Sequence, residues 1–205
     1  MKREGWHFCA ADLRLGWQDG RKIVVGETLT VEGSPRVCHH GLHALCVGNP
    51  LVDALEWAAG PIICRVLLGG KLDYDFDREK FCATERTVLQ MLTLEQSIAC
   101  LRGFLVRVII ANASPENRRR VRRLVKLWLS GEATLEEVQK LETCVGSRFW
   151  GACERAKQED FSPKRLLLAT WVSQGLSRTR LNRWFLAALH KAMKEARADA
   201  PAVPV

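Results

Sequence analysis

Apolar residues in the first 92 positions come in short runs that turn-forming residues interrupt. These runs cover residues 6–9, 23–25, 28–31, 62–68 and 87–92. Short apolar runs punctuated by Gly, Pro, Asn and Asp are typical of strands joined by turns. The pattern therefore predicts a small, twisted, mostly antiparallel sheet, with one helix over residues 51–58 between Pro50 and Pro61.

The spacing of apolar residues changes to a helical period after Thr93. Apolar side chains then recur every three or four residues, at Leu94, Ile98, Leu101, Leu105 and Val108. Further helices are indicated by cap signals at Ser114–Pro115, Thr134–Glu137 and Ser162–Pro163. We expect an α+β chain with a mixed domain over residues 1–110 and an all-helical region over residues 111–205.

Charge separates the same two parts. Residues 1–110 hold 13 Lys+Arg and 13 Asp+Glu, whereas residues 111–205 hold 18 and 10, so the net charge of +8 belongs to the helical region. Basic residues gather opposite an apolar stripe at Arg118, Arg119, Arg122, Arg123 and Lys126. Such a face favours nucleic acid as a partner, because cations displace the counterions of the phosphate backbone. A solvated helix face is the alternative interpretation.

Several classes of protein are disfavoured by the sequence. No uncharged apolar stretch reaches the roughly 18 residues of a membrane span, and no apolar segment follows the charged N-terminus as in an export signal. We therefore expect a cytoplasmic protein with reduced cysteines and no membrane partner. Walker A, G-x-G-x-x-G, H-E-x-x-H and G-x-S-x-G motifs are all missing, which argues against nucleotide hydrolysis and serine chemistry.

Three of the five histidines and two of the eight cysteines lie within residues 38–46. One interpretation is a zinc site made by Cys38, His40, His43 and Cys46. Another is a strand whose alternation turns His43 away from Leu42 and Ala44 and toward a cleft. A third is that His43 is a structural histidine with satisfied hydrogen bonds.

Two resemblances come from the segments around this cluster. Residues 41–44, 52–57 and 60–69 resemble an uncharacterised bacterial and phage family that shares the patterns GLHAS, PLDALxYAPGP and LCRVxLGG. At a greater distance, the order of segments is similar to the ADP-ribosyltransferases related to the poly(ADP-ribose) polymerases. Their conserved segments correspond here to Trp6–His7, Gly41–Ala44, Val66–Gly69 and Thr84–Val88.

The second resemblance implies NAD as cofactor and a catalytic triad of His7, His43 and Glu85. Glu85 would stabilise the oxocarbenium-like state formed when the nicotinamide glycosidic bond breaks. His7 would hold the ribose and amide, and His43 would stack on the nicotinamide where the family has Tyr. We expect Glu85 and His43 to line one pocket, with His7 on a neighbouring strand.

The expected function is NAD-dependent ADP-ribosyl transfer to a macromolecular acceptor, or an NAD-binding remnant of it. Three departures from the transferase pattern favour the remnant, namely His43 in place of Tyr, Phe8 in place of Gly, and a domain shorter than in most members of that superfamily. The alternative is a phage or mobile-element accessory protein that binds nucleic acid or a host protein through its basic helical half without catalysis. Convergence of His7, His43 and Glu85 on one cleft separates the enzyme from the other classes.

Overall fold

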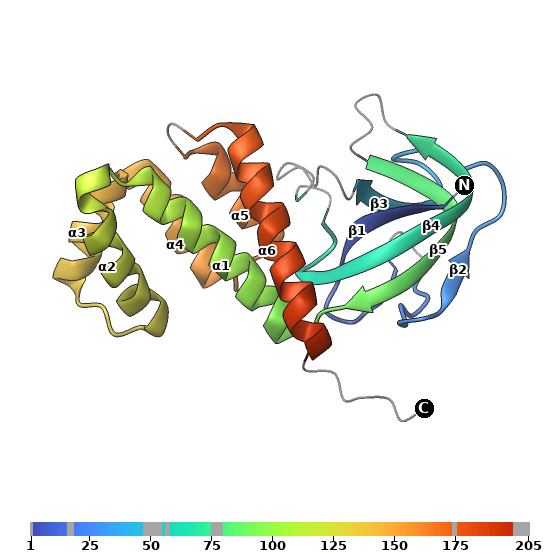
Figure 1. Ribbon diagram of the computed structural model, residues 1–205, viewed down its shortest axis with the longest axis horizontal. Coiled ribbons are helices and arrows are strands. Elements are labelled where there is room, and N and C mark those ends of the chain that lie inside the picture. Colours follow the sequence, from blue (N-terminus) through green and yellow to red (C-terminus); the bar gives the residue numbers. More distant parts are fainter. Residues whose placement is uncertain are drawn as a thin grey trace.

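The computed structural model describes residues 2–15, 19–46, 55, 58–74, 80–173 and 176–198, and only the backbone of Cys46. Strands form the first part of the chain and helices the second, at opposite ends of an elongated molecule (Figure 1). This confirms the α+β class. The strands are β1 (Arg3–Cys9), β2 (Thr28–Thr30), β3 (Leu42–Cys46), β4 (Ile62–Tyr74) and β5 (Lys80–Met91). The predicted helix over residues 51–58 lies almost entirely outside the described residues.

Helices account for most of the remaining described chain. They are α1 (Leu94–Asn112), α2 (Arg118–Ser130), α3 (Leu135–Val145), α4 (Ser147–Gln158), α5 (Pro163–Trp171) and α6 (Arg178–Ala198), with a 3₁₀ turn at Pro115–Asn117 before α2. Capping boxes begin α1 at Thr93 and α3 at Thr134. Helix α4 follows α3 after a break at Gly146, and it is not among the helices predicted from the sequence. Among the described helices, none combines the length and apolarity needed to cross a bilayer.

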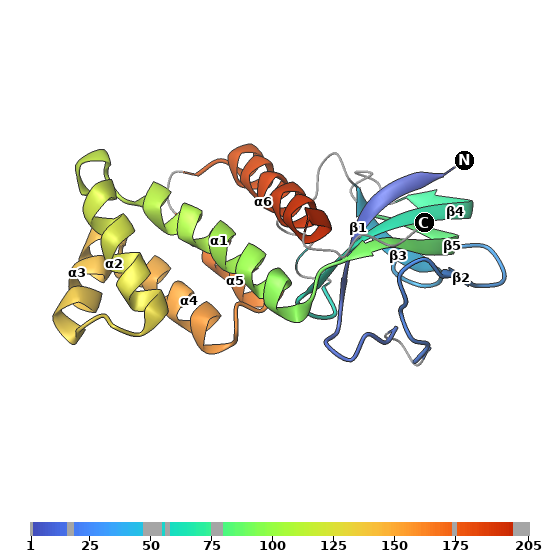
Figure 2. The ribbon, with the colours of Figure 1, turned by 60° about the horizontal axis from the view of Figure 1, so that its bottom comes forward.

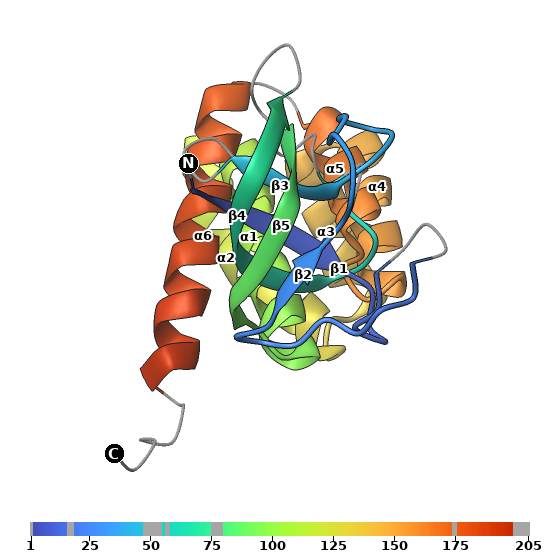
Figure 3. The ribbon, with the colours of Figure 1, turned by 90° about the vertical axis from the view of Figure 1, so that its right-hand side faces the viewer.

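The strand pairings close into a ring. β1 pairs with β3 and β4, and β5 also pairs with β3 and β4, all antiparallel. β2 pairs with the part of β5 that does not pair with β3. Figure 3 shows β4 and β5 side by side in front of β1. Register shifts at Arg65/Val66 and Gly69/Leu72 bend this long pair, as β-bulges do. The bend allows β4 to pair with both β1 and β5, and β5 to pair with both β3 and β4, so that the ring closes.

Two of the predicted strands differ in the structure. Ile23–Val25 forms no strand, although Val25 makes an isolated bridge to Val88. The predicted strand at 87–92 is the end of a much longer strand that begins at Lys80. In β5 the polar residues Thr84, Glu85 and Arg86 interrupt the apolar pattern, so hydropathy alone misses the hydrogen-bonded length of that strand.

β1 connects the sheet to the helices because both of its faces are buried. Trp6 and Phe8 point toward α6, with ring centroids 5.7 Å from His190 and 6.1 Å from Phe185. The alternate residue Cys9 belongs to the apolar interior of the ring. Figures 1 and 2 show α6 running beside α1 and reaching the sheet. A single core therefore extends from β1 through α1 to the other helices.

Gly5 tests this close packing. A Cβ atom at Gly5 would lie 2.7 Å from the Leu45 carbonyl oxygen and 2.9 Å from the Ala44 Cβ. Gly5→Ala should lower the free energy of unfolding by about 2 kcal/mol or more, because β1 and β3 must separate. The control is Gly103→Ala in α1, where nothing lies within 4 Å, and it should stabilise by about 0.5–1 kcal/mol. Urea unfolding measures both, and equal stability of the two variants would contradict the packing described.

Candidate functional site

A cavity of about 390 Å³ lies where β1 and β3 separate. The two strands pair only at Gly5↔Cys46 and Trp6↔Leu45, although β1 continues to Cys9 and β3 begins at Leu42. The volume falls in the range of small-molecule sites. Its lining includes the polar side chains of His7, His43, Arg14, Asp19, Lys80 and Arg86. The gap between the strands is therefore the principal candidate site.

Arg86 joins three strands across this gap. Its side chain starts from β5, is only 1% exposed, and donates through Nη1 to the His43 carbonyl oxygen at 3.0 Å. The same nitrogen lies 3.2 Å from His7 Nδ1, and because a guanidinium can only donate, Nδ1 is the acceptor. Arg86 thus supplies the hydrogen bond that β1 would have given to the His43 carbonyl if the two strands had stayed together.

The other side of the Arg86 guanidinium is unpaired. Nε and Nη2 are buried without a hydrogen-bond partner. Burial lowers the pKa of Arg86 to about 10, so the group is still a cation at neutral pH. Buried cations are normally paired with carboxylates. In the part of the chain that the structure describes, no carboxylate accepts from Arg86.

His43 is a neutral imidazole. Its Nε2 accepts a hydrogen bond of 3.0 Å from the backbone N–H of Cys38, a residue held at the unusual φ of +67°. Partial burial, together with the charge of Lys80, lowers the pKa of His43 from 6.5 to about 4. Because Nε2 is occupied, His43 offers the cavity an uncharged ring.

His7 is neutral for a related reason. Burial, and then the charge of Arg86, lowers its pKa well below the usual value of 6.5. The structure therefore brings His7 and His43 together at one cavity, as the sequence predicted.

Asp19, which lines the same cavity, is already bound by Arg21 through two short hydrogen bonds of 2.6 and 2.7 Å. The cavity has an excess of positive charge and suits an anionic ligand.

Glu85 does not join the two histidines. Neighbouring residues of a strand point to opposite faces, and Arg86 occupies the face that turns inward. The Glu85 carboxylate lies over the bulge of β4, where a Cβ on Gly69 would sit 2.9 Å from Oε2. Glu85 is not part of the cavity lining. The prediction that Glu85 and His43 line one pocket is therefore wrong.

The residues of the zinc hypothesis have separate partners. Cys38 Sγ accepts from Lys80 Nζ at 3.1 Å, and His40 Nε2 donates to the Glu32 carbonyl oxygen at 2.6 Å. The Cys46 side chain lies outside the described residues. Among the side chains that are described, no group of three or more His, Cys, Asp or Glu residues is arranged to hold a metal ion.

The basic face of α2 is exposed, as the sequence analysis expected. The predicted cations Arg118, Arg119, Arg122, Arg123 and Lys126 are all exposed, and so is Arg120. The opposite side of the helix carries Val121, Leu124, Val125 and Trp128, which are buried. Figures 1 and 2 place α2 at the end of the molecule away from the sheet. The cavity and the basic face are therefore separate candidate surfaces.

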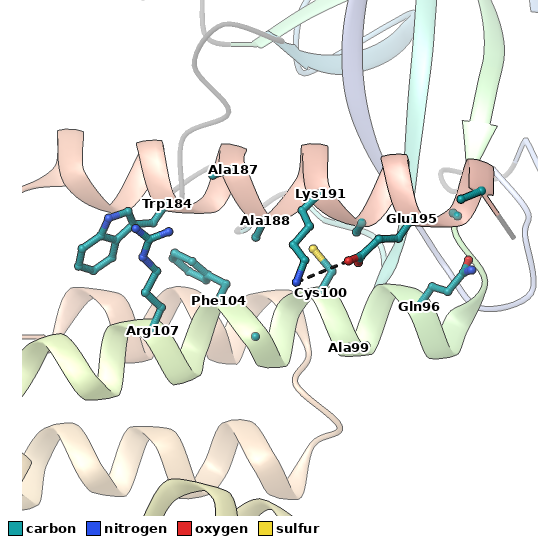
Figure 4. A pocket seen from close by; sticks show the side chains of 14 residues that line it. Gln96, Ala99, Cys100, Phe104, Arg107, Trp184, Ala187, Ala188, Lys191 and Glu195 are labelled. Atoms are coloured by element: carbon teal, nitrogen blue, oxygen red, sulfur yellow. Dashed lines mark ion pairs between the residues drawn. The ribbon is translucent and has the colours of Figure 1, made fainter. Parts of the chain in front are cut away.

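A second cavity, of about 760 Å³, is a groove between α1 and α6 (Figure 4). Small side chains, among them Ala99 and Ala188, form much of its wall. Its charged groups already have partners, since Lys191 pairs with Glu195 at 3.5 Å and Arg107 lies 4.6 Å from the Trp184 ring centroid. The groove contains no group prepared for a polar ligand comparable to Arg86.

The lowered pKa of His43 predicts acid sensitivity. Well above pH 6.5, His43 is neutral in both the folded and unfolded states. Its titration then takes nothing from the free energy of unfolding. As the pH falls toward 4, the unfolded state takes up a proton that the folded state excludes, so the free energy of unfolding decreases. After allowance for the partial exposure of His43, the loss is about 2 kcal/mol.

His43→Gln removes this titration while its amide oxygen can still accept the Cys38 N–H. Urea unfolding at pH 7 and pH 4.5 should show a smaller loss of stability for His43→Gln than for the wild type. His7 titrates in both proteins and contributes to the loss in each. Identical losses in the two proteins would show that His43 is protonated normally in the folded state.

Comparison with known families matches residues 3–100 to a domain of unknown function, DUF7666. The matched segment contains the five described strands, the cavity residues His7, His43 and Arg86, and ends within α1. No curated protein and no solved structure matches the chain. The match agrees with the expectation of an uncharacterised family over the first hundred residues.

Proposed function

We propose that the strand domain binds an NAD-type nucleotide in the cavity between β1 and β3, as an NAD-binding remnant of an ADP-ribosyltransferase. One observation carries the proposal, namely that His7 and His43 line the same cavity. These are the two positions to which the resemblance assigns nucleotide binding. The excess of positive charge around the cavity also suits a dinucleotide, whose phosphates are negative.

The residues present fit the binding of such a nucleotide. His7 is placed to hydrogen-bond a ribose hydroxyl or an amide, and the neutral ring of His43 is suited to stack on a heterocycle. The unpaired Nε and Nη2 atoms of Arg86 leave a buried cation that a negatively charged ligand would balance. NAD itself would supply the activated nicotinamide glycosidic bond.

Transfer is not part of this proposal, because the cavity lacks the required carboxylate. Cleavage of the glycosidic bond develops positive charge on the sugar, which a nearby carboxylate must stabilise. Glu85 lies outside the lining, and Asp19, the one carboxylate among the described lining residues, is held by Arg21. The geometry supports binding of the nucleotide better than cleavage of its glycosidic bond.

Titration calorimetry of the full chain with NAD tests the proposal. Wild-type protein should bind NAD, and His43→Gln should weaken the affinity about tenfold, the value of one lost stacking contact. Glu85→Gln is the matched control and should bind as the wild type does. Circular dichroism confirms that each variant is folded.

Two outcomes would contradict this function. If the wild type does not bind NAD at millimolar concentration, the nucleotide proposal fails. If the wild type releases nicotinamide from NAD and Glu85→Gln abolishes the release, the protein is a transferase in which Glu85 reaches the substrate.

A second candidate function is nucleic-acid binding by α2. The observation in its favour is that six basic side chains are exposed on one helix whose opposite face is buried, namely Arg118, Arg119, Arg120, Arg122, Arg123 and Lys126. Because the cations are not required for packing, they are free to contact a phosphate backbone. This function is independent of the cavity, and the two can coexist in one protein.

Salt dependence distinguishes this surface from a merely solvated helix. If α2 binds duplex DNA, neutralising Arg118, Arg119, Arg122 and Arg123 together should reduce the slope of log K against log salt by roughly three units. The variant should fold normally, since the four side chains are exposed. Unchanged binding and an unchanged slope would assign these residues to solvation alone.

A further inference from the structure

We propose that Arg86 anchors an oxyanion group, a phosphate or a carboxylate, of the ligand that occupies the cavity between β1 and β3. The identity of that ligand as a nucleotide rests on the function proposed above. The anion site itself rests on the geometry of Arg86 and of the groups around it.

The unpaired atoms of Arg86 form one recognition edge. In a planar guanidinium, Nε–H and Nη2–H point the same way, and this edge binds the two oxygens of a carboxylate or phosphate side by side. Both of these atoms lack a partner, and both belong to a side chain that lines the cavity. The arrangement offers two parallel donors, where a lysine would offer a point charge.

The rest of the guanidinium is fixed in place. Nη1 contacts the His43 carbonyl oxygen at 3.0 Å and His7 Nδ1 at 3.2 Å, so the side chain is held from β3 and from β1. A donor edge oriented before binding loses little conformational entropy when the anion arrives. Arg86 is therefore preorganised for the ligand.

Burial of the charge requires a counter-charge. A cation that is 1% exposed is costly unless it is paired, and Asp19, the acidic residue of the cavity, is engaged by Arg21. The interior also contains the thiols of Cys9 and Cys64, whose sulfurs lie 3.6 Å apart. The hydrogen bond from Cys64, and less strongly the charge of Arg86, lowers the pKa of Cys9. The two thiols are the groups of the interior that could compete with a ligand anion for Arg86.

The surroundings of Arg86 favour an anion over a neutral ligand. Arg14 and Lys80 line the same cavity, so two more cations face whatever binds there. Arg14 is oriented by donating to the Gly20 carbonyl oxygen at 2.7 Å. His7 and His43 are neutral and add surfaces for a heterocycle.

Thermal unfolding in matched salts tests the anion site directly. At equal ionic strength and pH 7.5, sodium phosphate should raise the melting temperature of the wild type above its value in sodium chloride. Sodium acetate is the second arm, because stabilisation by acetate as well as phosphate indicates a site for any oxyanion. Stabilisation by phosphate alone indicates a phosphate site.

Two variants separate the effect of the two parallel donors of Arg86 from the effect of its positive charge. Arg86→Met removes both and should abolish the specific effect of phosphate, whereas Arg86→Lys keeps the charge and should retain only part of it. Arg102→Met, an exposed arginine on α1, is the matched control and should respond to phosphate as the wild type does. NAD affinity should fall roughly ten- to a hundredfold in Arg86→Lys, the value of a lost charge-assisted pair of hydrogen bonds.

The outcomes distinguish this inference from the proposed function. If phosphate stabilises the protein through Arg86 but NAD does not bind, the anion site stands and the nucleotide is wrong. If NAD binds equally to the wild type and to Arg86→Lys, the anion site is wrong and the nucleotide stands. If neither variant folds, the wild type alone is the test. A melting temperature that is no higher in phosphate than in chloride would mean that the counter-charge of Arg86 lies in the protein interior, and it would overturn the inference.

Discussion

Burial of β1 on both faces is the constraint on which the other features of the molecule depend. One face presents Trp6 and Phe8 to α6, and the other contributes Cys9 to the interior of the strand ring. A strand enclosed in this way cannot shift its register without exposing an apolar set of side chains. The position of His7, between Trp6 and Phe8, is fixed as a consequence.

The separation of β1 from β3 is what turns a structural sheet into a site. Where the two strands part, the His43 carbonyl needs a donor, and Arg86 provides it from across the ring. One side chain thereby satisfies the backbone, orients His7 and keeps two buried donors without a partner in the protein. Structural and binding roles are combined in Arg86, so its contribution to either is best separated by the lysine variant.

Much of the fold was predictable because it follows from the periodicity of apolar residues and from local cap signals such as Thr93 and Thr134. The site was predictable only in part. His7 and His43 stand out by residue type, whereas the choice between Glu85 and Arg86 depends on which neighbour faces inward. That facing is set by the pairing of β5 with β3 and β4, which the hydropathy of β5 alone does not encode. Burial of an arginine also runs against composition rules, so Arg86 was missed.

The pairing of β1 with α6 has a consequence for synthesis of the chain. Trp6 and Phe8 leave the ribosome long before their partners His190 and Phe185, which lie far later in the chain. Until then an apolar strand face stays uncovered, a condition that invites association with other nascent chains. Contacts over such a sequence separation also slow folding. The protein is therefore expected to depend on chaperones during translation more than a helical protein of its length does.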